Sequence, residues 1–206
     1  MATKLEFDQL IKDGFNLFKE NMGLLVGASL IASLISSFTL FILAGPMTVG
    51  VLLLTRNCLK KKQEQPEIGD IFKGFSSFLD SFLLTLIYFV LSGMLATIPV
   101  LGHVISFALG AFYWWGIVFI AFENLSVGAT IQKLIDETKS GDFLLPLVFA
   151  VIASLIILSG LLICCVGIFF TIPVGYCMMV CCYEATFGKR STAHASTPPD
   201  PSIFLK

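Results

Sequence analysis

Three long stretches without a charged side chain restrict the fold of this chain more than any other feature. No Asp, Glu, Lys or Arg occurs in residues 21–55, 81–122 or 143–183, which are blocks of 35, 42 and 41 residues. A hydrocarbon core about 30 Å thick needs about 20 apolar residues per helix, so each block can hold two membrane-spanning helices. Each block also contains residues that interrupt helices: Gly and Pro in "AGP" (44–46) and "TIPVLG" (97–102), and Gly in "CCVG" (164–167). The chain is therefore predicted to form three transmembrane hairpins, or six helices.

The composition agrees with lipid as the solvent. Hydrophobic residues make up 56% of the 206 residues and charged residues only 13%, whereas soluble domains are about 45–50% apolar. We therefore expect an all-α, polytopic membrane protein. The first block is the shortest, and its second helix is expected to run from about Pro46 past Arg56, whose long side chain can reach the interface. The mixed charges of the first 20 residues do not predict a cleavable signal peptide.

The positive charges predict an orientation. All 13 Lys and Arg residues lie outside the three blocks, so they lie on one side if every block crosses the membrane and returns. The positive-inside rule makes that side cytoplasmic and places both termini there. The other side then carries three uncharged turns, with His103 as its one titratable group. Such a small outer surface argues against a receptor for a large external ligand, and we expect a protein of the inner (plasma) membrane.

Two segments sixty positions apart are variations of one phrase, "IKDGFNLFKEN" from Ile11 and "IFKGFSSFLDS" from Ile71. Gly50 and Gly110 match at the same offset, and "ATIQKLIDETKSGDF" from Ala129 is a degenerate third copy. In these segments apolar residues recur at helical spacing, with charged residues on the other face. We expect an internal repeat in which a cytoplasmic, amphipathic interfacial helix precedes each hairpin. The alternative is that these segments extend the transmembrane helices.

The repeats are predicted to span about 5–62, 67–123 and 126–188 within a single membrane domain, residues 1–188. The remaining residues, 189–206, are rich in Ser, Thr and Pro. This composition predicts a disordered cytoplasmic tail.

Small residues recur at intervals of four in the predicted spans. Such ridges let helix backbones approach closely, and serine hydroxyls can bond across a helix pair. Packing within the helix bundle is favoured over a pore lining or a dimer interface. The candidate packing residues are Ala28, Ala32 and Ser36, their neighbours Ser29, Ser33 and Ser37, and the set Gly102, Ser106 and Gly110.

Three motifs carry a family resemblance: the Gly-Phe pair of the repeated phrase, "GP" at Gly45 and Pro46, and the closing run "FTIPVGYCMMVCCYEATFG" at 170–188. Over residues 5–188 the chain resembles a broad group of uncharacterised bacterial six-helix membrane proteins. That group includes the YciC type and the membrane domains attached to some glycerophosphodiester phosphodiesterases. The resemblance implies the topology and a bacterial inner membrane, and it supplies no catalytic or binding residues. The chain departs from the group after Glu184, where a more charged pair is expected.

The sequence offers little support for catalysis or metal binding. Cys177, Cys181 and Cys182 are close on one helix, but no His or carboxylate pattern completes a zinc site. Packing is favoured for these cysteines and for Cys58, with S-acylation as the alternative, and no structural disulfide is expected. No nucleophile elbow or zinc signature is present, and a catalytic role for Glu123 or Glu184 has no support. The spans contain no Asp, Glu, Lys or Arg for an ion relay. We expect a non-enzymatic protein without a cofactor or a nucleic-acid partner.

A cluster of basic residues is a candidate contact for anionic lipid headgroups, because each cation near a membrane surface contributes about 1 kcal/mol. Membrane orientation alone would explain these charges equally well. The residues are Arg56, Lys60, Lys61, Lys62 and Lys73.

Taken together, these features favour a scaffold or helper for other membrane components, with a membrane protein or a second copy of the chain as its partner. Two alternatives stay open. A transporter or channel for an apolar or amphipathic small molecule would use the serine-lined ridges. A membrane-shaping protein would insert its hairpins from the cytoplasmic side without crossing, as the short first block suggests.

Overall fold

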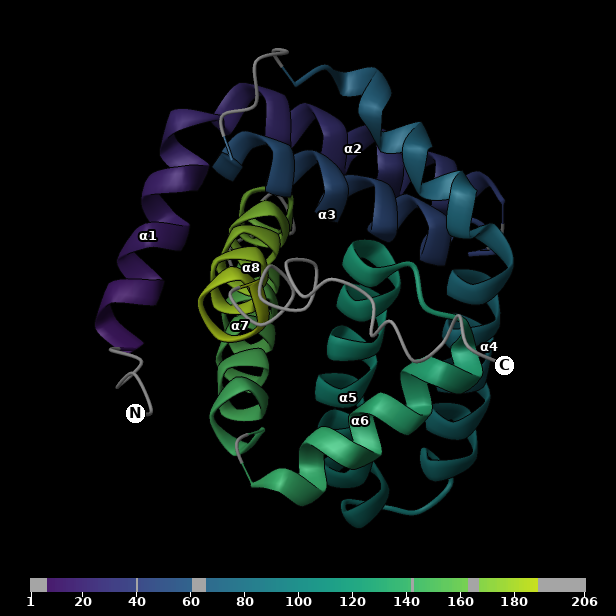
Figure 1. Ribbon diagram of the computed structural model, residues 1–206. Coiled ribbons are helices and arrows are strands. Elements are labelled where there is room, and N and C mark those ends of the chain that lie inside the picture. Colours follow the sequence, from purple (N-terminus) through teal and green to yellow (C-terminus); the bar gives the residue numbers. More distant parts are fainter. Residues whose placement is uncertain (1–6, 40, 61–65, 142, 163–166, 189–206) are drawn as a thin grey trace, which may run out of the picture.

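The computed structural model describes residues 7–39, 41–60, 66–141, 143–162 and 167–188. Within these ranges the chain is helical and contains no strand, which confirms the prediction of an all-helical protein. Two elements are not α-helices, since η1 is a 3-10 helix and η2 a π-helical segment. The elements, most of them labelled in Figure 1, are α1 (Phe7–Glu20), α2 (Met22–Phe38), α3 (Ala44–Lys60), η1 (Ile68–Ser77), α4 (Phe78–Leu95), α5 (Leu101–Glu123), α6 (Val127–Ser140), α7 (Leu144–Leu162), α8 (Ile168–Tyr183) and η2 (Glu184–Gly188).

Several helices have the length and composition of membrane spans. In the described part of the chain, three helices qualify: Ile68–Leu95, which joins η1 and α4, Leu101–Glu123, and Ile168–Gly188. Two bent pairs bring the number to five if each counts as one span; α1 meets α2 at 87°, and α6 meets α7 at 115°. The described chain thus has three to five candidate spans, which is compatible with a multi-pass membrane protein. Its α3 runs past Arg56 to Lys60, as predicted.

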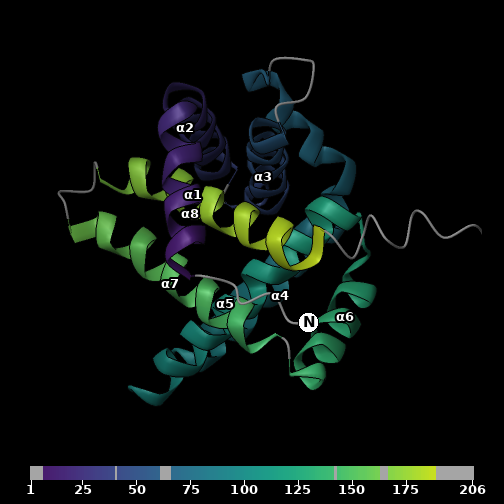
Figure 2. The same ribbon diagram turned by 60° about the vertical axis from the view of Figure 1, so that its left-hand side comes forward.

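The long helices pack in pairs of chain neighbours, α2 with α3, α4 with α5 and α7 with α8. These pairs run in different directions. In Figure 1, α2 and α3 cross the top of the molecule whereas α5 runs down its centre. Figure 2 shows α8 and α5 crossing the view at different inclinations. The pairs therefore diverge from the region where α3, α5 and α8 meet.

The three segments predicted to be amphipathic are helical, but they join the following helices in two ways. α1 and α6 turn sharply into α2 and α7. By contrast, η1 continues into α4 as the single helix Ile68–Leu95. This second segment is therefore an extension of the next helix, which was the alternative to a separate interfacial helix.

Each of these three segments packs on the second helix of another pair. α1 lies along α8, where Gly14 faces Met178. η1 lies along α3, with Gly74 at the contact, and α6 packs on α5, where its side chains face Gly116. Every segment therefore joins its own helix pair to a different pair.

Glycine permits the closest of these contacts, between α3 and the helix Ile68–Leu95. A Cβ atom at Gly50 would overlap the backbone carbonyl of Ile71, and one at Gly74 would overlap the carbonyl oxygen of Pro46. A Cβ atom at Gly45 would overlap the backbone of α4. The two helices therefore cross with their backbones in direct contact, which side chains larger than hydrogen would prevent.

The main core lies where α3, α5 and α8 meet. Trp115, Phe119 and Tyr183 are fully buried there. The indole N–H of Trp115 donates to the carbonyl oxygen of Pro146 at 3.0 Å, so the buried polar atom of this side chain is satisfied. That bond also ties α5 to the start of α7.

The predicted small-residue ridges lie at helix contacts to different extents. In α2, Ala28, Ser29, Ala32 and Ser36 are buried, Ser33 is half-buried and Ser37 is exposed. In α5, Gly102 is buried, whereas Ser106 and Gly110 are half-buried. A Cβ atom at Gly102 would overlap the carbonyl oxygen of Leu95, and one at Gly110 would lie 3.4 Å from the Tyr88 hydroxyl. The second ridge thus brings α5 close to α4.

Candidate functional site

Charged side chains gather where the ends of α3, α5 and α8 meet α6; we call this cluster the ionic junction, made of Arg56, Lys60, Glu123, Lys133 and Glu184. Arg56 donates from Nε to Oε1 of Glu184 at 2.5 Å. Lys60 Nζ lies 3.1 Å from the same oxygen. The side chains of Arg56 and Glu184 are only 19% and 20% exposed. Water therefore screens this ion pair less than it screens a surface pair.

Glu123 is the second anion of the junction. Lys133 of α6 reaches it across the helix contact, with Nζ 2.6 Å from Oε1 and 2.5 Å from Oε2. The Tyr183 hydroxyl of α8 donates to Oε1 at 3.1 Å. One carboxylate at the end of α5 therefore connects α6 and α8.

Aromatic rings form the inner wall of the ionic junction. The guanidinium carbon of Arg56 lies 4.5 Å from the ring centre of Phe122 and 5.4 Å from that of Tyr183. Lys133 Nζ lies 4.7 Å from the ring centre of Phe119. A cation over a ring gains about 0.5–1 kcal/mol at exposed sites and more when desolvated. Both cations are thus held between a carboxylate and a ring face.

The turn between α5 and α6 is fixed beside the ionic junction by side chains from the neighbouring helix. Asn124 ends α5 in the left-handed region, at φ 53°, which Asn tolerates better than most residues. The Ser77 hydroxyl donates to Asn124 Oδ1 at 2.8 Å. Asp80 Oδ1 accepts the backbone N–H of Val127 at 3.0 Å, where the helix dipole favours an anion. These bonds position α6, and through it Lys133.

The chemistry that this arrangement supports is ion pairing. Each of the two carboxylates has at least one cation within ion-pair distance. Within the residues that the structure describes, no group of three or more His, Cys, Asp and Glu side chains is placed to hold a metal ion. The junction therefore neutralises charge at the ends of helices that are otherwise apolar, and it locks these ends together.

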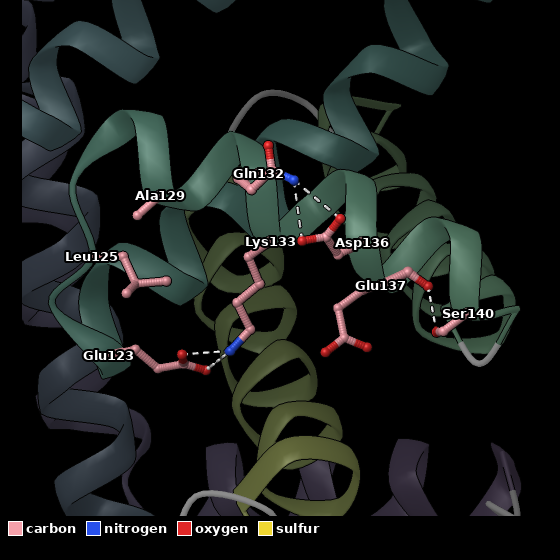
Figure 3. A pocket seen from close by; sticks show the side chains of 8 residues that line it. All are labelled: Glu123, Leu125, Ala129, Gln132, Lys133, Asp136, Glu137 and Ser140. Atoms are coloured by element: carbon pink, nitrogen blue, oxygen red, sulfur yellow. Dashed lines mark hydrogen bonds and ion pairs between the residues drawn. The ribbon is translucent and has the colours of Figure 1, made fainter. Parts of the chain in front are cut away.

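An open groove of about 610 Å³ follows α6 beside the ionic junction. Figure 3 shows Lys133 extending toward Glu123, with Asp136 and Glu137 farther along α6. Gln132 Nε2 donates to both carboxylate oxygens of Asp136, at 3.1 Å and 3.2 Å. The lining residues described for this groove include one cation and three carboxylates, so the groove is acidic in balance.

The basic residues predicted to contact lipid headgroups lie in different settings. Arg56 points inward to Glu184, and Lys60, with 38% of its side chain exposed, pairs with the same carboxylate. Lys73 is 62% exposed and pairs with Asp70 within η1. Lys61 and Lys62 lie outside the described residues.

The other candidates do not form a common site. His103 is exposed near the start of α5. Cys58, Cys177, Cys181 and Cys182 are buried free thiols. The predicted tail at 189–206 and the cysteines at 164 and 165 lie outside the described residues.

Sequence reasoning gave no role to Glu123 or Glu184 and missed their partners Lys133 and Tyr183. One signal was present, because Arg56, Glu123 and Glu184 are the first charged residues after the three apolar blocks. If the helices before them cross the same membrane, these residues lie at a similar depth. Their pairing joins residues 128 positions apart in the chain, and nothing local predicts it.

No protein-family model, curated protein or solved structure matches this chain significantly.

Proposed function

We propose that the protein is a non-enzymatic, multi-pass protein of the inner (plasma) membrane that acts as a scaffold for other membrane components. It crosses the membrane as three hairpins, six spans in all, with both termini and the ionic junction on the cytoplasmic side. The bacterial group that the sequence resembles has this topology and location.

The observation that carries the proposal is the convergence of Arg56, Glu123 and Glu184 in one ionic junction. Each is the first charged residue after an apolar block, so the second helix of every hairpin ends at this place. Charged groups are costly inside hydrocarbon, which favours a common position outside it. The excess of Lys and Arg near these ends favours the cytoplasmic side. Large apolar side chains left exposed on α4, α5 and α7 suit contact with lipid tails.

The packing of the amphipathic segments supports the internal repeat. Gly14 and Gly74 occupy matching positions of the repeated phrase. In each case the glycine lies against the second helix of a different hairpin, α8 for Gly14 and α3 for Gly74. Because each segment packs on a hairpin other than its own, the three hairpins form one unit. A scaffold needs such a fixed arrangement to hold its partners.

The acidic groove along α6 supplies the scaffold with a cytoplasmic surface for a partner. Asp136 and Glu137 line it together with Glu123. Complementary charge steers association, so the matching surface is a basic segment next to a membrane span of another protein.

Topology is tested first. In a chain whose six cysteines are replaced, a single cysteine is introduced either as His103→Cys or as Asp136→Cys, and intact cells are treated with a membrane-impermeant maleimide. We expect labelling at position 103 in intact cells and at position 136 only after permeabilisation. The reverse pattern, or labelling of both positions in intact cells, would contradict the proposed topology.

The scaffold role is tested by photo-crosslinking in the membrane. A photoreactive amino acid replaces Gln132 beside the groove, and the captured proteins are compared between the wild type and the double variant Asp136→Lys, Glu137→Lys. We expect a defined set of membrane proteins that the double variant loses and that the control Asp8→Lys, at an exposed position of α1, retains. Capture that is insensitive to the charge reversal, or adducts with lipid alone, would refute this role of the groove.

A membrane-shaping role is the second candidate, and the first hairpin favours it. α2 and α3 have 17 residues each, which corresponds to about 26 Å of helix against a core of about 30 Å. The helix pairs also run in different directions (Figures 1 and 2). This arrangement suits hairpins that insert into one leaflet of the bilayer at different angles. In this case position 103 would stay unlabelled even after permeabilisation, and the purified protein would reduce the diameter of reconstituted vesicles as its density rises.

A further inference from the structure

A half-open cavity of about 180 Å³ lies between α2, α3 and α8, toward the turn that joins α2 to α3. It is at the opposite end of α3 from the ionic junction, because Met47 and Thr48 line it whereas Arg56 lies more than two turns farther along the helix. The junction and the cavity are therefore separate features.

The cavity wall is divided into a polar and an apolar side. The hydroxyls on the polar side come from Ser29, Ser33, Ser36 and Ser37 of α2, from Thr48 of α3 and from Tyr176 of α8. Ala32, Met47 and Phe41 contribute apolar surface. None of the described lining side chains carries a charge, so a charged ligand would be desolvated without compensation.

Ser29 is the exceptional group on the polar side. It is 2% exposed, and its Oγ atom has no hydrogen-bond partner. Two other hydroxyls of the wall do have hydrogen-bond partners. The Ser36 hydroxyl donates to the Ala32 carbonyl oxygen at 2.7 Å, and the Tyr176 hydroxyl is hydrogen-bonded to the side chain of Thr48. A buried hydroxyl without a partner costs free energy that a bound donor or acceptor would recover.

The volume of the cavity and the polarity of its wall limit which molecule could form a hydrogen bond with Ser29 Oγ. The cavity is large for a single bridging water, because it corresponds to about six waters at roughly 30 Å³ each. Water also gains little against the apolar side, where a hydrocarbon chain would be stabilised. The fitting ligand has one polar head group and a short apolar chain.

We propose that this cavity binds a neutral amphipathic molecule of the primary-alcohol class. The hydroxyl of the ligand exchanges a hydrogen bond with Ser29 Oγ, and its chain of roughly six to eight carbons lies against Met47 and Phe41. Such molecules partition into the bilayer, from which the cavity is filled. The site does not depend on the scaffold function.

The experiment uses the full chain in lipid nanodiscs and two photoreactive probes of equal length, an eight-carbon alcohol and an eight-carbon alkane, each carrying a diazirine. Peptide mapping by mass spectrometry locates the labelled residues. We expect the alcohol to label the cavity lining more strongly than the alkane does and excess 1-octanol to suppress that labelling. Ser29→Ala removes the hydroxyl without adding volume and should weaken the apparent affinity about fivefold, the loss of one hydrogen bond.

Ser154→Ala is the matched control, because Ser154 of α7 is not among the described residues that line the cavity and its hydroxyl already donates to the Ala150 carbonyl oxygen at 2.8 Å. This variant should retain the labelling of the wild type. Ser29→Leu fills the cavity and should abolish the labelling; if it does not fold, Ser29→Ala and the comparison of the two probes still decide. Equal labelling by alcohol and alkane, or unchanged labelling of Ser29→Ala, would overturn the proposal and leave the cavity as a contact with lipid or water.

Discussion

The contact between α3 and η1 makes a prediction that a single methyl group can test. In Gly50→Ala, the new Cβ atom would overlap the carbonyl oxygen of Ile71 and lie 2.6 Å from its carbonyl carbon and 2.9 Å from its Cα atom. All three are backbone atoms, so no side chain can rotate away. On the facing helix, Gly74 is as close to Pro46 and Gly50, which leaves no direction for a small local shift.

The magnitude follows from two opposing terms. Overpacking of a close contact costs about 1–3 kcal/mol, and a backbone clash belongs at the upper end of that range. Replacing a helical glycine by alanine returns about 0.5–1 kcal/mol. The net loss expected for Gly50→Ala is therefore about 2 kcal/mol. For a chain of this length that corresponds to a fall in Tm of about 4–8 °C.

The assay is thermal unfolding in a mild detergent, followed by the fluorescence of the tryptophans near the core. Gly93→Ala is the matched control, because Gly93 is also helical but its added Cβ would meet no atom within 4 Å. The control should keep or slightly raise the Tm. If Gly50→Ala is as stable as Gly93→Ala, the backbones of α3 and η1 do not cross in contact and the reasoning fails.

Three further predictions concern stability, measured in the same unfolding assay. Trp115→Phe removes the hydrogen bond to the Pro146 carbonyl and leaves a void in the core, so it should lower the free energy of unfolding by about 2–4 kcal/mol. An unchanged Tm would show that the indole is not buried as described. Glu123→Gln leaves the partly buried Lys133 cation without its anion and should cost about 1–3 kcal/mol, part of which the double variant with Lys133→Met should recover; no recovery would mean that the two side chains are not coupled. Gly141 ends α6 at φ 80° in open space, so Gly141→Ala should cost about 1 kcal/mol from backbone strain alone, and a stabilised variant would contradict the left-handed conformation.

The candidate site was predictable only in part. The charged residues at the ends of the apolar blocks could be identified from the sequence, because charge is excluded from hydrocarbon wherever the chain lies. Which of them form ion pairs could not be predicted, since the carboxylates of Glu64, Glu67 and Asp70 are all nearer to Arg56 in the chain than that of Glu184. The small residues of α2 were identified as a packing ridge, but the cavity that Ser29 borders exists only when α3 and α8 complete its walls.

The sequence alone determined that the chain is helical, apolar and broken near 97–102, because charge, hydropathy and the backbone preferences of Gly and Pro are local properties. The break predicted at 44–46 comes slightly earlier, since α2 ends at Phe38 and α3 begins at Ala44, and the break predicted at 164–167 lies mostly outside the described residues. Only the tertiary structure decided that α1 packs on α8, that η1 packs on α3 and that the helix pairs diverge. The physical reason is that lipid solvates every apolar face equally well, so hydrophobicity does not select partners in a membrane. Selection depends on which surfaces fit at close range, such as Gly50 against Ile71, and on which charges meet, such as Arg56 and Glu184.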